Sequence, residues 1–121
     1  MLHARRRLWL LTMGDAVTEA ISMLQEQLKV VNAVGLHARP AALFVSQAGR
    51  FQCSIQVRNL TAPGGWVDAK SILGILTLGV EKDHEIEVRA EGPDEAEAIK
   101  ALGDLVRSDF AGTSLRGPSG S

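Results

Sequence analysis

The sequence predicts an α+β fold, in which a four-stranded antiparallel sheet carries three helices on one face in the order βαββαβα. Apolar and polar residues alternate along 52–58 and along 85–90, which is typical of strands with one buried face. Apolar residues three and four positions apart predict helices over 38–48 and 93–106. Strands that bury one face favour an antiparallel sheet with its helices on a single side.

The first half of this order begins with a strand over 28–32. The helix over 38–48 follows, and Gly49 is suited to end it. After the first alternating strand, the Pro-Gly-Gly segment at 63–65 predicts the turn of a hairpin, and the returning strand starts at Trp66.

The second half contains a short helix that begins around Lys70 and Ser71, followed by a polar turn at 81–83. The alternating strand over 85–90 leads to 92–95, where a proline and two acids predict the start of the last helix. The apolar stripe of that helix consists of Ala98, Ile99, Leu102, Leu105 and Val106.

We divide the chain into an N-terminal extension at 1–26, one domain at 27–108 and a flexible tail at 109–121. The apolar run near the N-terminus is too short for a signal peptide or a membrane span. Helical spacing over 17–28 allows a short amphipathic helix. We favour the alternative that translation starts at a later methionine and that the extension is disordered or has no structural role.

Composition places the chain among ordinary globular proteins. It has 121 residues and a net charge of −1, which gives no electrostatic argument for nucleic acid or a membrane as partner. The single cysteine, Cys53, cannot form an internal disulfide and is expected in the core, with the cytoplasm as compartment. The three histidines have no metal-ligand spacing, and His84 is expected at an edge or facing solvent. We expect no cofactor.

The most informative segment is Gly-Leu-His-Ala-Arg-Pro-Ala at 35–41, which places His37 where a strand ends and a helix begins. Unpaired N–H groups and the helix dipole make such a position an anion site. A nucleophilic imidazole there can accept a phosphoryl group, and Arg39 can pair with its oxygens. Pro40 is tolerated in the first turn. A simple polar histidine that caps the helix is the alternative.

These residues, together with Ala-Lys-Ser-Ile-Leu-Gly at 69–74, resemble HPr, the histidine phosphocarrier of the bacterial phosphoenolpyruvate-dependent sugar phosphotransferase system. The resemblance covers roughly 28–106 and includes the order of the elements. It implies that His37 accepts a phosphoryl group through Nδ1 from enzyme I and passes it to sugar-specific IIA proteins. We therefore expect a carrier with a covalent phosphohistidine intermediate rather than an enzyme that turns over. We also expect a monomer, because a carrier that docks and hands on phosphate is best served as one.

Ser71 is a second candidate site, at the predicted start of the short helix, where its hydroxyl can cap backbone N–H groups. In many HPr proteins the matching serine is phosphorylated by HPr kinase/phosphorylase, so the resemblance implies regulation here. A plain helix cap is the alternative, and we weight the two equally.

An apolar docking patch around His37 is expected for the partner proteins. Its candidates are Ala42, Phe44, Ile72, Leu73 and Ile75, of which some must pack inside. Ser46 and Gly49 stand where many HPr proteins carry lysines, so electrostatic steering toward acidic partners is expected to be weaker.

Two other functions compete with the sugar phosphocarrier. An RNA-binding βαββαβ module has the same element order but needs aromatic residues on an open sheet face and a basic surface, which this composition does not supply. The other is a regulatory HPr paralogue in a nitrogen-related or other non-sugar phosphorelay, which His37 leaves open.

Overall fold

The structure, a computed structural model, describes residues 5–13 and 16–110. Its strands are β1 (Arg5–Met13), β2 (Ala16–Lys29), β3 (Ser54–Asn59), β4 (Val67–Asp68) and β5 (Glu85–Glu91). Its helices are α1 (Ala38–Ala48), α2 (Ile72–Thr77) and α3 (Glu95–Arg107).

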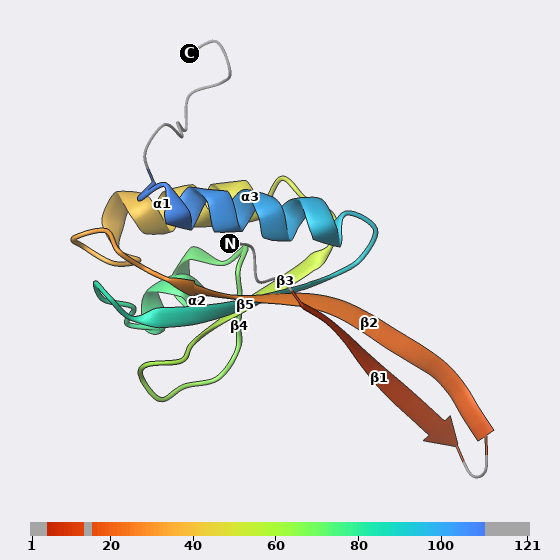
Figure 1. The fold of residues 1–121 in the computed structure, drawn as a ribbon. Helices are drawn as coiled ribbons and strands as arrows, with labels where there is room; N and C mark the ends of the chain where they lie inside the picture. The colour runs from red at the N-terminus through yellow and green to blue at the C-terminus, as the bar shows by residue number, and fades with distance from the viewer. Residues whose placement is uncertain (1–4, 14–15, 111–121) are drawn as a thin grey trace.

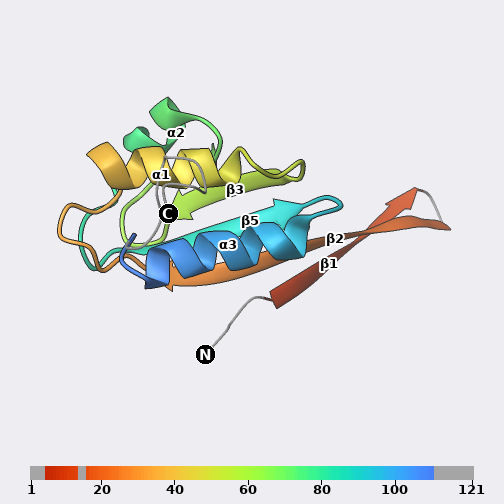
Figure 2. The same cartoon turned by 90° about the horizontal axis from the view of Figure 1, so that it is seen from above.

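The predicted fold class is confirmed. The order β2-α1-β3-β4-α2-β5-α3 is βαββαβα, and the strands form one antiparallel sheet in the order β1-β2-β5-β3-β4. The helices α1 and α3 lie across one face of the sheet, and α2 lies beside the amino-terminal half of α1 (Figures 1 and 2). The four predicted strands are β2, β5, β3 and β4, and β1 is an addition.

The N-terminal part differs from the expectation of a short helix over 17–28. These residues belong to β2, which pairs with β1 through 16–25 and with β5 through 24–29. Pairing on both sides favours the extended backbone over the helical spacing of the side chains, because tertiary context overrides a weak local pattern. The hairpin of β1 and β2 projects beyond the sheet in Figures 1 and 2, and β2 crosses the expected boundary between residues 26 and 27.

The hydrophobic core lies between the sheet and the helices. Its fully buried large side chains include Leu36, Phe44, Ile55, Ile75, Val88 and Leu102. Phe110, at the start of the expected tail, is also buried, with 4% of its surface exposed. The packed domain therefore extends at least to residue 110, and the rest of the expected tail lies outside the described residues.

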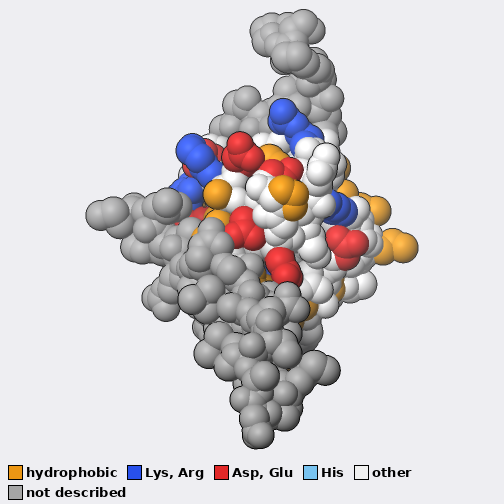
Figure 3. All heavy atoms as spheres, turned by 90° about the vertical axis from the view of Figure 1, so that its right-hand side faces the viewer, with side chains coloured by type: hydrophobic (Ala, Val, Ile, Leu, Met, Phe, Trp, Pro, Cys, Tyr) orange, Lys and Arg blue, Asp and Glu red, His pale blue; other side chains and the backbone are white. Residues whose placement is uncertain are grey.

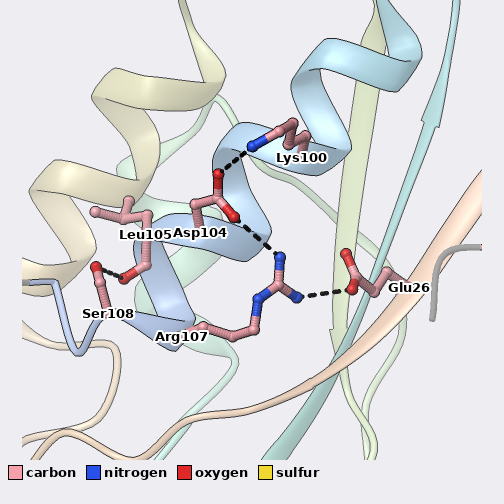
Figure 4. Close-up of polar contacts among 6 residues, drawn as sticks. All are labelled: Glu26, Lys100, Asp104, Leu105, Arg107 and Ser108. Carbon is pink, nitrogen blue, oxygen red and sulfur yellow. Dashed lines mark hydrogen bonds and ion pairs between the residues drawn. The ribbon is translucent and has the colours of Figure 1, made fainter. Parts of the chain in front are cut away.

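An ion pair between a buried carboxylate and a partly exposed guanidinium joins β2 to α3 (Figure 4). Nη1 of Arg107 donates to Oε2 of Glu26 at 2.8 Å, and Glu26 is 2% exposed. A Cβ on Gly103 would lie 2.6 Å from Nη2 of Arg107 and 2.9 Å from Oε1 of Glu26, so the absence of a side chain there makes room for the pair. Arg107 also bonds Asp104, which accepts from Lys100.

On the sheet face turned away from α1 and α3, two arginine side chains pack against a tryptophan ring, a contact that the composition did not predict. The guanidinium carbon of Arg89 lies 3.8 Å from the ring centroid of Trp66, and that of Arg58 lies 4.7 Å from it. Arg58 also pairs with the buried Glu87 at 2.8 Å. The cation–π contacts cover the Trp66 ring with charged neighbours and tie β3 and β5 to the segment before β4.

Figure 3 shows acidic side chains interspersed with basic ones at the end of the molecule that lies to the right in Figure 1. Such a mixture matches the net charge of −1 for the whole chain. In the part of the chain that the structure describes, no helix is long and apolar enough to cross a bilayer.

Candidate functional site: His37 at the start of α1

His37 lies between β2 and α1, directly before the first residue of the helix. Its backbone is extended, with φ −128° and ψ 163°, and α1 begins at the next residue. Its side chain makes no capping hydrogen bond to the helix and is 37% exposed. His37 therefore occupies the N-cap position without capping the helix through its side chain, and the ring is accessible.

The helix starts with a strained residue. Ala38 has a φ of +51°, in the left-handed region that costs an L-residue about 1–2 kcal/mol. The N–H of Ala41 lies 3.5 Å from the carbonyl oxygen of His37, at the limit of a hydrogen bond. Strain of this kind persists only where the surrounding structure imposes it, and it is concentrated at functional sites. Pro40 stands in the first turn, and Arg39 is exposed there, two residues after His37.

A second loop reaches the site because Gly35 permits a close approach of two backbone segments. Gly35 has a φ of +65°, and a Cβ on it would overlap the carbonyl oxygen of Val80. The next residue, Leu36, donates its N–H to that same oxygen at 3.0 Å. The residues that follow, His37 and Glu81, are consequently neighbours although they lie far apart in the sequence.

Glu81 is the functional candidate that sequence reasoning missed. Its Oε2 lies 3.3 Å from Nε2 of His37, and its side chain is 63% exposed. In the sequence it is one of two acids in the polar turn at 81–83, and no local signal distinguishes it. Glu81 becomes a neighbour of His37 only because the loop before α1 and the loop before β5 approach each other.

His84 helps to hold this turn. Its Nδ1 accepts the N–H of Glu81 at 3.1 Å and lies 3.1 Å from Nδ2 of Asn59. Asp83 donates its N–H to the carbonyl oxygen of Val30 at 2.6 Å. His84 is half-buried rather than simply facing solvent, because it links the turn to the end of β3.

Ser71 is the N-cap of α2, with its Oγ accepting the N–H of Gly74 at 3.0 Å. The capping role expected from the sequence is therefore present. Its own N–H donates to the carbonyl oxygen of Asp68 at 3.1 Å, and the side chain is half-buried. The neighbouring Lys70 donates from Nζ to the carbonyl oxygen of Phe51 at 2.7 Å, which fixes the approach to the helix.

The structure separates the candidates for a docking patch. Phe44 and Ile75 have 0% of their surface exposed, so their assignment to a docking surface is wrong. Ile72 and Leu73 are 41% and 72% exposed, and Ala42 is half-buried. Short helices show apolar spacing on both faces, which is why spacing alone could not divide these residues.

Two exposed apolar residues near these elements were not among the candidates. Leu76 on α2 is 39% exposed, and Val34, three residues before His37, is 52% exposed. Leu76, Ile72 and Leu73 all belong to α2, and these three residues form what we call the α2 apolar surface.

Cys53 is a core residue, as expected, with 1% of its surface exposed. Burial, together with the Asp94 carboxylate, raises the pKa of its thiol to about 12. A thiol of this kind is not a nucleophile at neutral pH. Among the described residues, no group of three or more His, Cys, Asp or Glu side chains could hold a metal ion.

Comparison with known proteins finds relatives by family model, by curated sequence and by solved structure. Residues 24–108 match the family model described as the PTS HPr component phosphorylation site. The multiphosphoryl transfer protein of Vibrio cholerae is 44% identical over 80 residues, and that of Salmonella typhimurium is 37% identical over 97 residues. The matches cover 66% and 80% of this chain but only 20% and 25% of those proteins.

Solved structures agree with this match. HPr-C-His from Thermoanaerobacter tengcongensis has a TM-score of 0.68 and 46% identity. The match covers 98% of that chain and 74% of this one. The phosphocarrier protein HPr from Bacillus anthracis has a TM-score of 0.65 and 42% identity, with 96% of that chain and 69% of this one covered. The family model over residues 24–108, the curated relatives and the solved structures thus agree, and the chain belongs to the HPr phosphocarrier family of the phosphotransferase system.

Proposed function

We propose that this chain accepts a phosphoryl group on His37 from phosphorylated enzyme I and passes it to IIA proteins or domains. The observation that supports this most is the placement of the ring. It is partly exposed at the start of α1, makes no capping bond, and contacts Glu81 through Nε2 rather than Nδ1.

In this proposal the Nδ1 lone pair attacks the phosphorus atom of the phosphoryl group on enzyme I. The new N–P bond forms as the bond between phosphorus and the donor atom breaks, and the electron pair of that bond returns to the donor. The helix start and Arg39 stabilise the negative charge of the phosphoryl group. The reverse steps deliver it to the acceptor, so stabilisation must stay moderate for the carrier to release its cargo.

Partner proteins would dock on the α2 apolar surface, and α2 itself lies beside the amino-terminal half of α1 in Figure 2. Ala42, Ile72 and Leu73 remain candidates there. Ser71 begins the same helix, so its phosphorylation by HPr kinase/phosphorylase would place charge at the docking surface. We further propose that the domain expected at 27–108, together with the buried Glu26 and Phe110 at its two ends, acts as the carrier unit, as a monomer in the cytoplasm.

The curated relatives suggest that a domain of this kind can be part of a longer transfer protein. They are named multiphosphoryl transfer proteins, and this chain spans about a quarter or less of their length. A carrier domain of this size can work alone or joined to other transfer domains, and the proposed step at His37 is the same in both.

The test is a reconstituted relay with enzyme I, labelled phosphoenolpyruvate and IIA proteins of the same organism. We expect labelling that passes on to a sugar-specific IIA, and Arg39→Ala should slow transfer without a matching loss of thermal stability. Transfer only to a nitrogen-related IIA would favour the regulatory paralogue. No labelling of the wild-type chain would contradict the proposal.

A further inference from the structure

The contact between His37 and Glu81 has a chemical consequence for the histidine ring. We propose that Glu81 is a positioning residue, whose carboxylate accepts the Nε2–H bond of His37 and holds the neutral ring with its lone pair on Nδ1. This inference rests on the proposed function, in which His37 is the phosphoryl acceptor. It names a second residue for that reaction, from a loop outside the 35–41 segment.

The tautomer follows from which atoms can donate. An ionised carboxylate only accepts hydrogen bonds, so the bond at 3.3 Å to Glu81 Oε2 requires a hydrogen on Nε2 of His37. A neutral imidazole carries a single N–H, and Nδ1 is then an unprotonated nucleophile. A carboxylate that orients a catalytic imidazole in this way is a recurrent arrangement in nucleophilic and proton-transfer sites.

The backbone that carries the Glu81 side chain is held in place by several hydrogen bonds. Val80 is tied to Leu36, the N–H of Glu81 itself is bonded to His84, and Asp83 is bonded to Val30. These bonds set the backbone on both sides of Glu81, and only its side chain extends toward solvent. A carboxylate on so well-held a turn can restrict a neighbouring ring at little further cost in conformational entropy.

Glu81 acts in both directions of transfer. When Nδ1 gives its lone pair to phosphorus, the hydrogen on Nε2 stays, and the ring acquires positive charge that faces the Glu81 carboxylate. When the phosphoryl group leaves, the N–P electron pair returns to Nδ1 and the original tautomer is restored. No proton has to enter or leave the ring, so Glu81 supports a step that must run readily both ways.

The first measurement needs no partner protein. Long-range ¹H–¹⁵N spectra of the imidazoles in alkaline buffer report which nitrogen of His37 carries the hydrogen. We expect Nε2–H in the wild-type chain and a mixture of tautomers in Glu81→Gln, because an amide can either accept or donate. Nδ1–H in the wild type, or an unchanged spectrum in Glu81→Gln, would overturn the inference.

The second measurement is the rate of phosphoryl acceptance from enzyme I. Loss of one charge-assisted hydrogen bond predicts a rate about tenfold lower for Glu81→Gln, and Glu81→Asp should recover part of it by restoring the carboxylate. The matched control is Glu91→Gln, the same change at an exposed site at the other end of β5. Equal rates for Glu81→Gln and Glu91→Gln would reject a role for Glu81 in transfer. If instead the wild type is not labelled at all, the proposed function fails, while the spectra still decide whether Glu81 holds the ring.

Discussion

The N–H of Leu36 donates to the carbonyl oxygen of Val80 at 3.0 Å, and this one bond aligns the loop before α1 with the loop before β5. The residues that follow the two partners are His37 and Glu81, whose side chains meet. The bond exists because Gly35 has no side chain at the point of closest approach. The geometry of the site is therefore set by backbone contacts one residue away from it.

Gly35→Ala should consequently destabilise the domain and disturb His37. Gly79 provides a matched control, because its φ of +61° is close to the +65° of Gly35, but a Cβ there meets nothing within 4 Å. Gly79→Ala should cost only the left-handed strain of about 1–2 kcal/mol. Gly35→Ala should cost more, since it must also displace Val80. Urea unfolding compares the two, and equal costs would show that the close approach is not required.

Arg107→Ala should lower the free energy of unfolding by about 3 kcal/mol, because it leaves the Glu26 carboxylate buried without its partner. The control is Lys100→Ala, which removes the exposed i,i+4 pair with Asp104 and should cost about 0.3–0.5 kcal/mol. Both values come from denaturant titrations. A loss at Arg107 no larger than that at Lys100 would mean that solvent reaches Glu26 and replaces the bond.

Asp94 should make the free energy of unfolding depend on pH. Its carboxylate accepts the N–H groups of Gln52 at 2.8 Å and Cys53 at 2.9 Å, and the bond from Gln52 above all lowers its pKa below the usual value. A carboxyl whose pKa is lowered by folding stabilises the folded state above its unfolded pKa, and this contribution is lost as pH falls through the folded pKa.

Asp94→Asn should therefore lower the melting temperature at neutral pH, with a difference from wild type that shrinks below about pH 4. Thermal melts across this range provide the test, with Glu91→Gln as a control for loss of one exposed carboxylate. A difference that stays constant down to the lowest pH would show that the charge of Asp94 does not contribute.

Ser71→Asp tests the proposed regulation. Aspartate can cap α2 as serine does, so stability should stay near that of wild type, while its charge beside the α2 apolar surface should slow acceptance from an acidic partner. Ser71→Asn is the control, since it caps without charge. Transfer rates at low and high salt should converge for the Asp variant. A wild-type rate for Ser71→Asp at low salt would leave Ser71 as a cap only.

Much of the fold follows from local patterns, because the apolar residues of α1, α3, β3 and β5 each fall on one face with a clear period. The extent of β2 does not, since its strand conformation depends on pairing with β1 and β5. Helical spacing of the same residues gave the wrong structure there.

The candidate site divides in the same way. Seven consecutive residues, 35–41, predict that His37 lies at a helix start, and the residues next to Ser71 predict its role as a cap. Glu81 is 44 residues from His37 and meets it only through the approach of two loops. Burial of Phe44 beside exposure of Leu73 likewise depends on how the helices pack, which periodicity does not specify.

The most direct test of the account is to locate the phosphoryl group after incubation with enzyme I and phosphoenolpyruvate. We predict one acid-labile, base-stable phosphohistidine, with ³¹P and ¹⁵N spectra that place it on Nδ1 of His37, and no labelling of a folded His37→Ala variant. Phosphate on any other residue, or labelling that persists in His37→Ala, would contradict the assignment of His37 as the phosphoryl carrier.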